Sequence, residues 1–181
     1  AWLALSLLWA GGAAFLLARV VQGVLRLRSI ARRSPPIDGT EWRSLLTAID
    51  PKHGRRVRLL DGGSGVVPST WGIVQPVIVL PTEAAAWNPD QRRSVLAHEL
   101  AHVRRRDAAT GLLAHVGVAL HWTNPLAWLA LRRLESEREV ACDDQVIASG
   151  VAPIDYAHHI LEVVRASVRP VAAGSYAVGG T

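Results

Sequence analysis

The sequence predicts an α+β fold that is mainly helical, with a small β-sheet, and that is preceded by a transmembrane helix. Three observations support this expectation: an uncharged apolar run opens the chain, short β-prone runs occupy residues 56–80, and a long helical segment surrounds residues 98–102. The length of 181 residues suits one domain with enough chain to bury a core.

The apolar run covers residues 1–25. Residues 1–18 carry no charge, and Arg19 is the first charged side chain. About 20 apolar residues cross the hydrocarbon of a bilayer, and an arginine near one end reaches the surface with its long stem. The run therefore predicts a transmembrane helix. A buried core helix and a signal peptide are the alternatives, but neither a basic start nor a small-residue cleavage site is clear.

The residues after the apolar run predict its orientation. Arg26, Arg28, Arg32 and Arg33 follow directly, and the positive-inside rule places such an end in the cytoplasm. Cys142 is the lone cysteine, so no internal disulfide is possible, which fits a reducing compartment. We expect a protein of the cell membrane, the bacterial inner or plasma membrane, whose active site faces the cytoplasm. Its partners would include the lipid bilayer and further transmembrane segments of a longer protein.

The charge of the chain does not indicate a nucleic-acid-binding protein. The formal net charge is +5, and 19 of the 20 basic residues are arginine. A basic excess attracts nucleic acid or anionic lipid. The arginines are spread along the chain without an aromatic–basic platform, so we do not expect direct nucleic-acid binding. Half of the residues are hydrophobic (50%), which favours membrane contact.

A short helix over residues 41–49 and two or three strands are expected before the motif. Residues 56–60 and 71–73 have strand composition, and prolines bracket a third run, 77–80. Bracketing prolines favour an edge position. A substrate peptide can add to an edge as a further strand. We expect this of Val77, Ile78, Val79 and Leu80.

Residues 89–106 are predicted to form one helix, with Asn88 as its N-cap and a proline at its first position. This helix contains an H-E-x-x-H motif. His98 and His102 are four residues apart and share one face, and Glu99 lies one step round the turn. Two imidazoles aimed at one point, with a carboxylate beside a bound water, are the parts of a zinc hydrolase site. The alternative is a pair of exposed helical histidines that bind a glutamate.

A hydrolytic zinc site needs a third protein ligand. The chain leaves His102 in an apolar segment, turns at residues 124–125 and is predicted to return in a helix over 125–148. At the rise of a helix the outward leg is about 30 Å and the return to residue 139 about 21 Å. Residues near 135–143 therefore come back to the motif helix. Glu135, Glu139 and Asp143 lie on one face at spacing four and are the candidates. Residues 155–168 are expected to form a last helix.

Three stretches taken in order resemble the BlaR/MecR-type membrane metallopeptidases. They are His98-Glu-Leu-Ala-His102, Trp122-Thr-Asn-Pro125 and Glu139-Val-Ala-Cys-Asp143. Residues 69–81 resemble the segment before the motif helix of that family. The resemblance implies a gluzincin-like, zincin-type peptidase domain over 30–170. The resemblance itself covers roughly residues 40–165. From the sequence we also expect a transmembrane helix and basic segment over 1–29 before this domain and the tail of a truncated chain over 171–181 after it.

The resemblance also implies roles for individual residues. His98, His102 and Glu139 would hold one Zn²⁺ per chain, Glu99 would be the catalytic base, and Asp143 would hydrogen-bond a ligand histidine. From the residues alone, Glu135 stays open as the third ligand. The last helix offers further candidates for oxyanion or substrate contacts: Tyr156, His158 and His159.

The activity that the resemblance implies is regulated proteolysis. The chain would be a membrane-embedded zinc endopeptidase that cleaves a cytoplasmic protein, a transcriptional repressor in a stress or antibiotic response. A quality-control or prenyl-protein peptidase of the related membrane gluzincins is one alternative. A non-catalytic signalling or scaffold domain is an alternative of another class, and the intact Glu99 argues against it.

Overall fold

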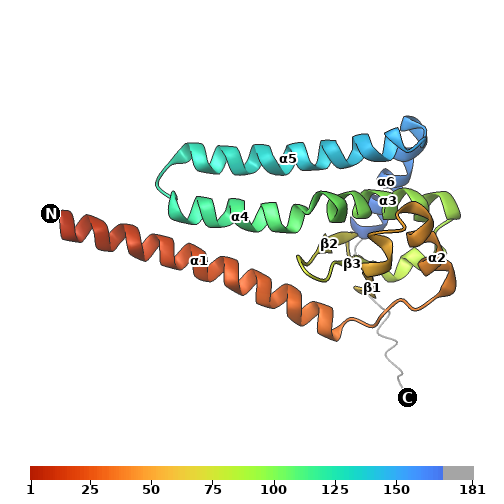
Figure 1. Ribbon diagram of the computed structural model, residues 1–181, viewed down its shortest axis with the longest axis horizontal. Helices are drawn as coiled ribbons and strands as arrows, with labels where there is room; N and C mark the ends of the chain where they lie inside the picture. The colour runs from red at the N-terminus through yellow and green to blue at the C-terminus, as the bar shows by residue number, and fades with distance from the viewer. Residues whose placement is uncertain (169–181) are drawn as a thin grey trace, which may run out of the picture.

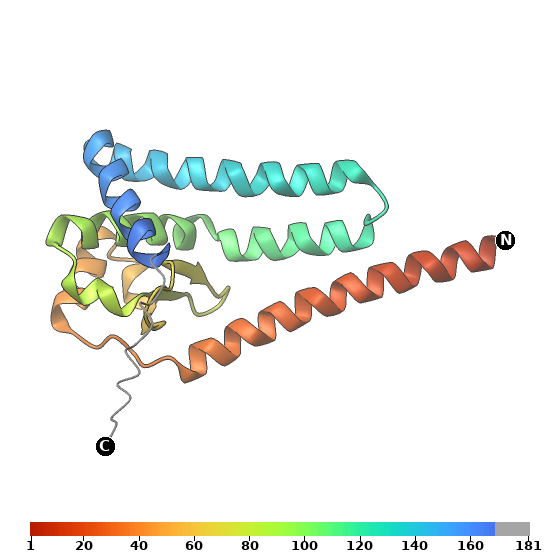
Figure 2. The same ribbon diagram turned by 180° about the vertical axis from the view of Figure 1, so that it is seen from behind.

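The computed structural model describes residues 1–168. A small domain of helices and strands carries two helical projections, a long N-terminal helix and a helical hairpin, which extend from it on the same side (Figures 1 and 2). The elements in chain order are α1 (Trp2–Arg33), α2 (Thr40–Ile49), β1 (Arg58–Asp61), β2 (Ser69–Trp71), β3 (Val77–Leu80), α3 (Pro89–Arg105), α4 (Asp107–Leu120), α5 (Pro125–Ala148) and α6 (Pro153–Val168), with 3₁₀ turns at Gly54–Arg56 and Thr82–Ala86. The expected mainly helical α+β class is confirmed. The predicted tail, 171–181, lies outside the described residues.

The three strands form one sheet in the order β1-β3-β2, so β3 is its central strand. Ile78 lies opposite Leu59 in the parallel β1 pairing and opposite Thr70 in the antiparallel β2 pairing. The prediction that Val77, Ile78, Val79 and Leu80 form a substrate-binding edge is therefore wrong. A proline removes a donor only at its own position, so Pro76 and Pro81 mark the ends of β3 and leave its ladder intact.

The side chains of β3 alternate between the two faces of the sheet and are buried on both. Ile78 and Leu80 join the main core, which α2, α3 and α6 complete through Leu46, Leu96 and Val163. The opposite face carries a smaller cluster, formed by Leu60, Val77, Val79 and Ala31 of α1. Burial on both faces explains the unbroken apolar run Val77–Leu80. The main core holds α3 against the sheet.

Helix α3 begins where the sequence predicts and ends one residue earlier. Asn88 accepts a hydrogen bond from the Gln91 amide, and the Gln91 side chain accepts one from the Asn88 amide, which is a capping box. Arg106 has a left-handed backbone (φ 60°) and separates α3 from α4. A left-handed residue ends a helix, so α3 stops before Arg106 and α4 begins at Asp107.

Helices α4 and α5 form the antiparallel hairpin, and α5 runs back beside α3 (Figure 1). Asn124 caps α5 through the Leu126 amide, and Pro125 is its first residue. The predicted turn at residues 124–125 and the return helix are confirmed.

Helix α1 is one continuous helix that includes the predicted basic segment. Among the helices of residues 1–168, α1 is the one that is long and apolar enough to cross a membrane. Its side chains are largely exposed, apart from Ala13 and Ala31. The division of the chain at residues 29 and 30 stays a prediction.

Candidate metal centre

Three donor atoms from two helices meet at one point between α3 and α5. His98 Nε2 and His102 Nε2 are 3.2 Å apart. Glu139 Oε2, from α5, lies 3.5 Å from the first and 3.8 Å from the second. The antiparallel packing of α5 on α3 therefore delivers the carboxylate to the face that carries both imidazoles. The structure brings together the three residues predicted as ligands.

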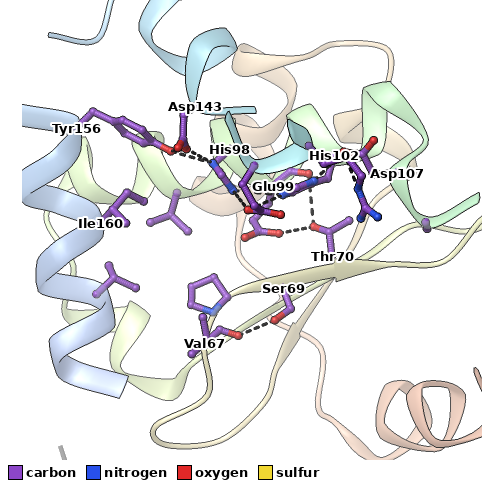
Figure 3. A pocket seen from close by; sticks show the side chains of 16 residues that line it. Val67, Ser69, Thr70, His98, Glu99, His102, Asp107, Asp143, Tyr156 and Ile160 are labelled. Carbon is purple, nitrogen blue, oxygen red and sulfur yellow. Dashed lines mark hydrogen bonds and ion pairs between the residues drawn. The ribbon is translucent and has the colours of Figure 1, made fainter. Parts of the chain in front are cut away.

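The other nitrogen of each imidazole is held by acceptors. His98 Nδ1 lies 2.8 Å from the Tyr156 hydroxyl and 3.0 Å from Asp143 Oδ1. The Tyr156 hydroxyl donates to the same Asp143 oxygen at 2.6 Å. These partners favour a proton on Nδ1, which leaves the lone pair of Nε2 directed at the meeting point. Asp143 thus lies where the sequence-based prediction requires it (Figure 3).

His102 is held by a different carboxylate, that of Asp107. Asp107 Oδ2 lies 2.8 Å from His102 Nδ1, and its side chain is 4% exposed. The Arg105 and Arg138 Nε atoms lie 3.4 and 3.8 Å from the same oxygen. Cys142 Sγ is 3.3 Å from His102 Nδ1. Burial raises the pKa of Cys142 to about 12, so the thiol stays protonated and inert near neutral pH.

This donor set fits a zinc ion. Two imidazole nitrogens and one carboxylate oxygen form a catalytic zinc site that keeps one position open. Zinc bonds of about 2.0–2.2 Å in a tetrahedron separate neighbouring ligand atoms by about 3.3–3.6 Å. The separations of 3.2, 3.5 and 3.8 Å lie close to that value. The candidate Glu135 is exposed and belongs to neither of the two groups of possible metal donors within residues 1–168.

The charges around the meeting point favour a bound cation. The contact with His98 is the main cause that lowers the pKa of Glu139. Burial opposes protonation of His98, but Glu139, Glu99 and Asp143 together outweigh it, so the pKa of His98 is raised. A site that stabilises positive charge in this way suits a divalent ion coordinated by neutral imidazoles.

Glu99 lies beside the two histidines, and Thr70 of β2 holds it. The Thr70 hydroxyl donates to Glu99 Oε2 at 2.5 Å (Figure 3). Burial raises the pKa of Glu99, whereas the Thr70 hydrogen bond and the two imidazoles act in the opposite direction. A buried carboxylate with a raised pKa, adjacent to a metal site, is suited to accept and return a proton near neutral pH.

A cleft runs from β2 across the meeting point to α6. Its walls are formed by Val67, Pro68, Ser69, Thr70, Val95, His98, Glu99, His102, Asp107, Ala108, Arg138, Glu139, Asp143, Tyr156, Ile160 and Val163. Of the three α6 candidates, Tyr156 lines the cleft. His159 lies 3.0 Å from Ser94 Oγ, and His158 is exposed beside Glu162. The structure therefore keeps these two histidines away from the donor atoms.

Sequence reasoning missed Asp107 and Thr70. Asp107 comes five residues after His102. In a continuous helix, side chains five residues apart do not lie on one face, so Asp107 would not be expected to contact the His102 imidazole. Its position depends on the left-handed Arg106. Thr70 precedes Glu99 by 29 residues, and no local pattern links them. The signal available for Asp107 was an acid directly after three arginines.

Comparison with known proteins gives one consistent result. The family model described as BlaR1 peptidase M56 matches residues 1–179. The chain is 26% identical over 141 residues to the regulatory protein BlaR1 of Bacillus licheniformis, covering 77% of this chain and 24% of that protein. It is 30% identical over 81 residues to the methicillin resistance mecR1 protein of Staphylococcus aureus, covering 44% of this chain and 14% of that protein. The chain thus spans about a quarter or less of the length of these relatives, and it belongs to the BlaR1 peptidase M56 family.

Proposed function

We propose that the chain is the catalytic part of a membrane-embedded zinc endopeptidase. Its substrate would be a cytoplasmic protein, a transcriptional repressor in a stress or antibiotic response. The observation that carries the proposal is the convergence of His98, His102 and Glu139 beside the buried carboxylate of Glu99. The relatives are named as regulatory and methicillin resistance proteins, which supports a signalling role.

The residues divide the chemistry of peptide hydrolysis among them. His98, His102 and Glu139 would hold the zinc ion, which supplies a Lewis acid that polarises a carbonyl and acidifies water. Glu99 takes the proton from the attacking water and passes it to the leaving amine. Asp107 and Asp143 hold the two imidazoles by their Nδ1 atoms, and Thr70 holds Glu99.

The substrate peptide would bind along β2. This strand is an edge of the sheet, and Ser69 and Thr70 form a wall of the cleft. Backbone groups of an edge strand pair with an extended peptide, so β2 takes the role that the sequence had suggested for β3. A peptide added here lies beside Glu99, because Thr70 contacts that side chain directly.

The active site would face the cytoplasm. The arginines at the C-terminal end of α1, Arg26 to Arg33, lie at the end of the helix nearest the domain (Figure 1). Positive charge at the end of a spanning helix marks its cytoplasmic side, and the domain follows that end in the chain.

Exchange of Glu99 for glutamine separates a peptidase from a scaffold. The full-length wild type and the Glu99→Gln variant are expressed in cells, and new protein N-termini are compared by mass spectrometry. Zinc is measured on the purified proteins. We expect one zinc per chain in both and a loss of cleavage of about 10²–10⁴-fold in the variant. The cleaved proteins should include a DNA-binding repressor.

Glu137→Gln is the matched control, because Glu137 is an exposed residue of α5 that pairs with Arg133. It should cleave as the wild type does. Equal cleavage by wild type and Glu99→Gln would refute the peptidase mechanism. If Glu139→Ala binds zinc with the content and affinity of the wild type, the assignment of Glu139 as the third zinc ligand is refuted. If none of the cleaved proteins binds DNA, the repressor substrate is refuted but the peptidase mechanism is not.

A further inference from the structure

We infer that the α4–α5 hairpin is a re-entrant membrane insertion, whose tip lies among lipid acyl chains beside α1. Residues 108–131 contain no Asp, Glu, Lys or Arg. Arginines bound this uncharged stretch along the chain, at residues 104–106 before α4 and at residues 132–133 within α5. Charges that bound an apolar segment in this way are typical of the two edges of a membrane-embedded element.

The hairpin exposes a large apolar surface. The exposed fractions are 71% for Leu113, 67% for Leu126 and 62% for Leu129. Contiguous apolar surface of this kind is rare on a protein surrounded by water and marks a membrane or protein contact. The uncharged helix α4 after Asp107 and the first two turns of α5 therefore suit hydrocarbon better than water.

Three polar side chains of the hairpin form hydrogen bonds within it, which lowers the cost of placing them in lipid. His115 Nδ1 lies 2.8 Å from the Gly111 carbonyl, and His121 Nδ1 lies 3.0 Å from the Gly117 carbonyl. The Trp128 indole donates to a backbone carbonyl of the turn at 2.9 Å. Each of these three bonds replaces one contact with water.

The turn of the hairpin packs on the uncharged part of α1. The Trp122 indole donates to the Trp9 carbonyl at 3.2 Å. Gly12 gives the ring its space, since a Cβ there would lie 2.4 Å from it. Trp9 and Gly12 lie within the 18 uncharged residues that open the chain. If α1 spans the bilayer, the turn beside these residues lies at hydrocarbon depth.

The lengths show how deep the hairpin reaches. Helix α4 has 14 residues, which is about 21 Å at the rise of a helix, and the uncharged part of α5, residues 125–131, is about 10 Å long by the same rise. The hydrocarbon of a bilayer is about 30 Å thick, so the hairpin enters from one side and turns back inside. Ala108, the first uncharged residue, lines the metal cleft together with Asp107. The metal centre therefore lies at the base of the hairpin, on the side of the membrane from which the hairpin enters.

Spin labels on single introduced cysteines test this placement. Leu113→Cys and Leu129→Cys are prepared in the full-length protein, reconstituted in phosphatidylcholine–phosphatidylglycerol vesicles, and labelled with a nitroxide. Collision rates are measured with oxygen, which concentrates in lipid, and with a nickel chelate, which stays in water. Ser136→Cys is the matched control, because residue 136 is exposed and lies seven positions after residue 129 on the same face of α5. The protein without an added cysteine gives the background.

We expect a several-fold higher oxygen-to-nickel ratio at residues 113 and 129 than at residue 136. High nickel accessibility at residues 113 and 129 would show that the hairpin lies in water and would overturn the inference. Low accessibility to both reagents would show that protein helices cover the hairpin and would overturn the lipid contact. The outcome does not depend on peptidase activity, so it is independent of the proposed function.

Discussion

Exchange of Asp107 for asparagine should weaken zinc binding without unfolding the domain. Asparagine is nearly isosteric with aspartate, and its side-chain oxygen can still accept a hydrogen bond from His102 Nδ1. The exchange removes the negative charge that now lies 2.8 Å from this nitrogen in a side chain only 4% exposed. A carboxylate in this position raises the basicity of the ligand imidazole and fixes its ring.

The size of the effect follows from burial. Loss of such a partner costs about 10–100-fold in metal affinity, or about 1.4–2.7 kcal/mol. Asp107 has almost no water to screen its charge, so we expect the upper part of this range. Asp143→Asn should cost less, because the Asp143 side chain is 45% exposed and the Tyr156 oxygen also lies within reach of His98 Nδ1.

The assay is competition between the purified protein and a fluorescent zinc chelator, with circular dichroism of the zinc-free protein as a check on folding. Asp144→Asn, on the exposed side of α5 next to Asp143, is the matched control and should bind zinc as the wild type does. A zinc Kd for Asp107→Asn within twofold of the wild-type value, in a folded protein, would refute the reasoning.

Further predictions concern the base, the packing on α1 and the thiol. The proposed base is the ionised form of Glu99, so activity should fall as the pH drops through the pKa of this carboxyl. Thr70→Val removes a hydrogen bond that lowers this pKa and should therefore move the acid limb of the kcat/KM profile to higher pH. Thr70→Ser keeps the hydroxyl and should leave the acid limb in place. Gly12→Ala places a Cβ against an indole ring and should destabilise the protein by about 1–3 kcal/mol, seen as a lower Tm in detergent. Gly11→Ala meets nothing within 4 Å, and an equal loss there would contradict this packing. Cys142 should resist iodoacetamide at pH 8 in the folded protein and react after denaturation, as followed by mass spectrometry; rapid alkylation of the folded chain would show that the thiol is accessible.

Local sequence determined the frame of the candidate site. The capping residues Asn88 and Pro89 set the start of α3, and the spacing of His98 and His102 puts both imidazoles on one face, since a helix repeats every 3.6 residues. The turn residues Asn124 and Pro125 reverse the chain and return α5. Each of these signals acts between residues a few positions apart, so each can be recognised without knowledge of the fold.

The tertiary structure decided which groups support those residues and which strands lie at the edges of the sheet. The bond from Thr70 to Glu99 requires that β2 pack on α3, and the contact of Asp107 with His102 requires the left-handed turn at Arg106. Strand β3 is central because it pairs with both β1 and β2, which come before it in the chain and lie on either side of it in the sheet. Local propensity shows that a strand forms, but the order of strands and the approach of distant helices depend on burial of the whole core, which only the assembled chain defines.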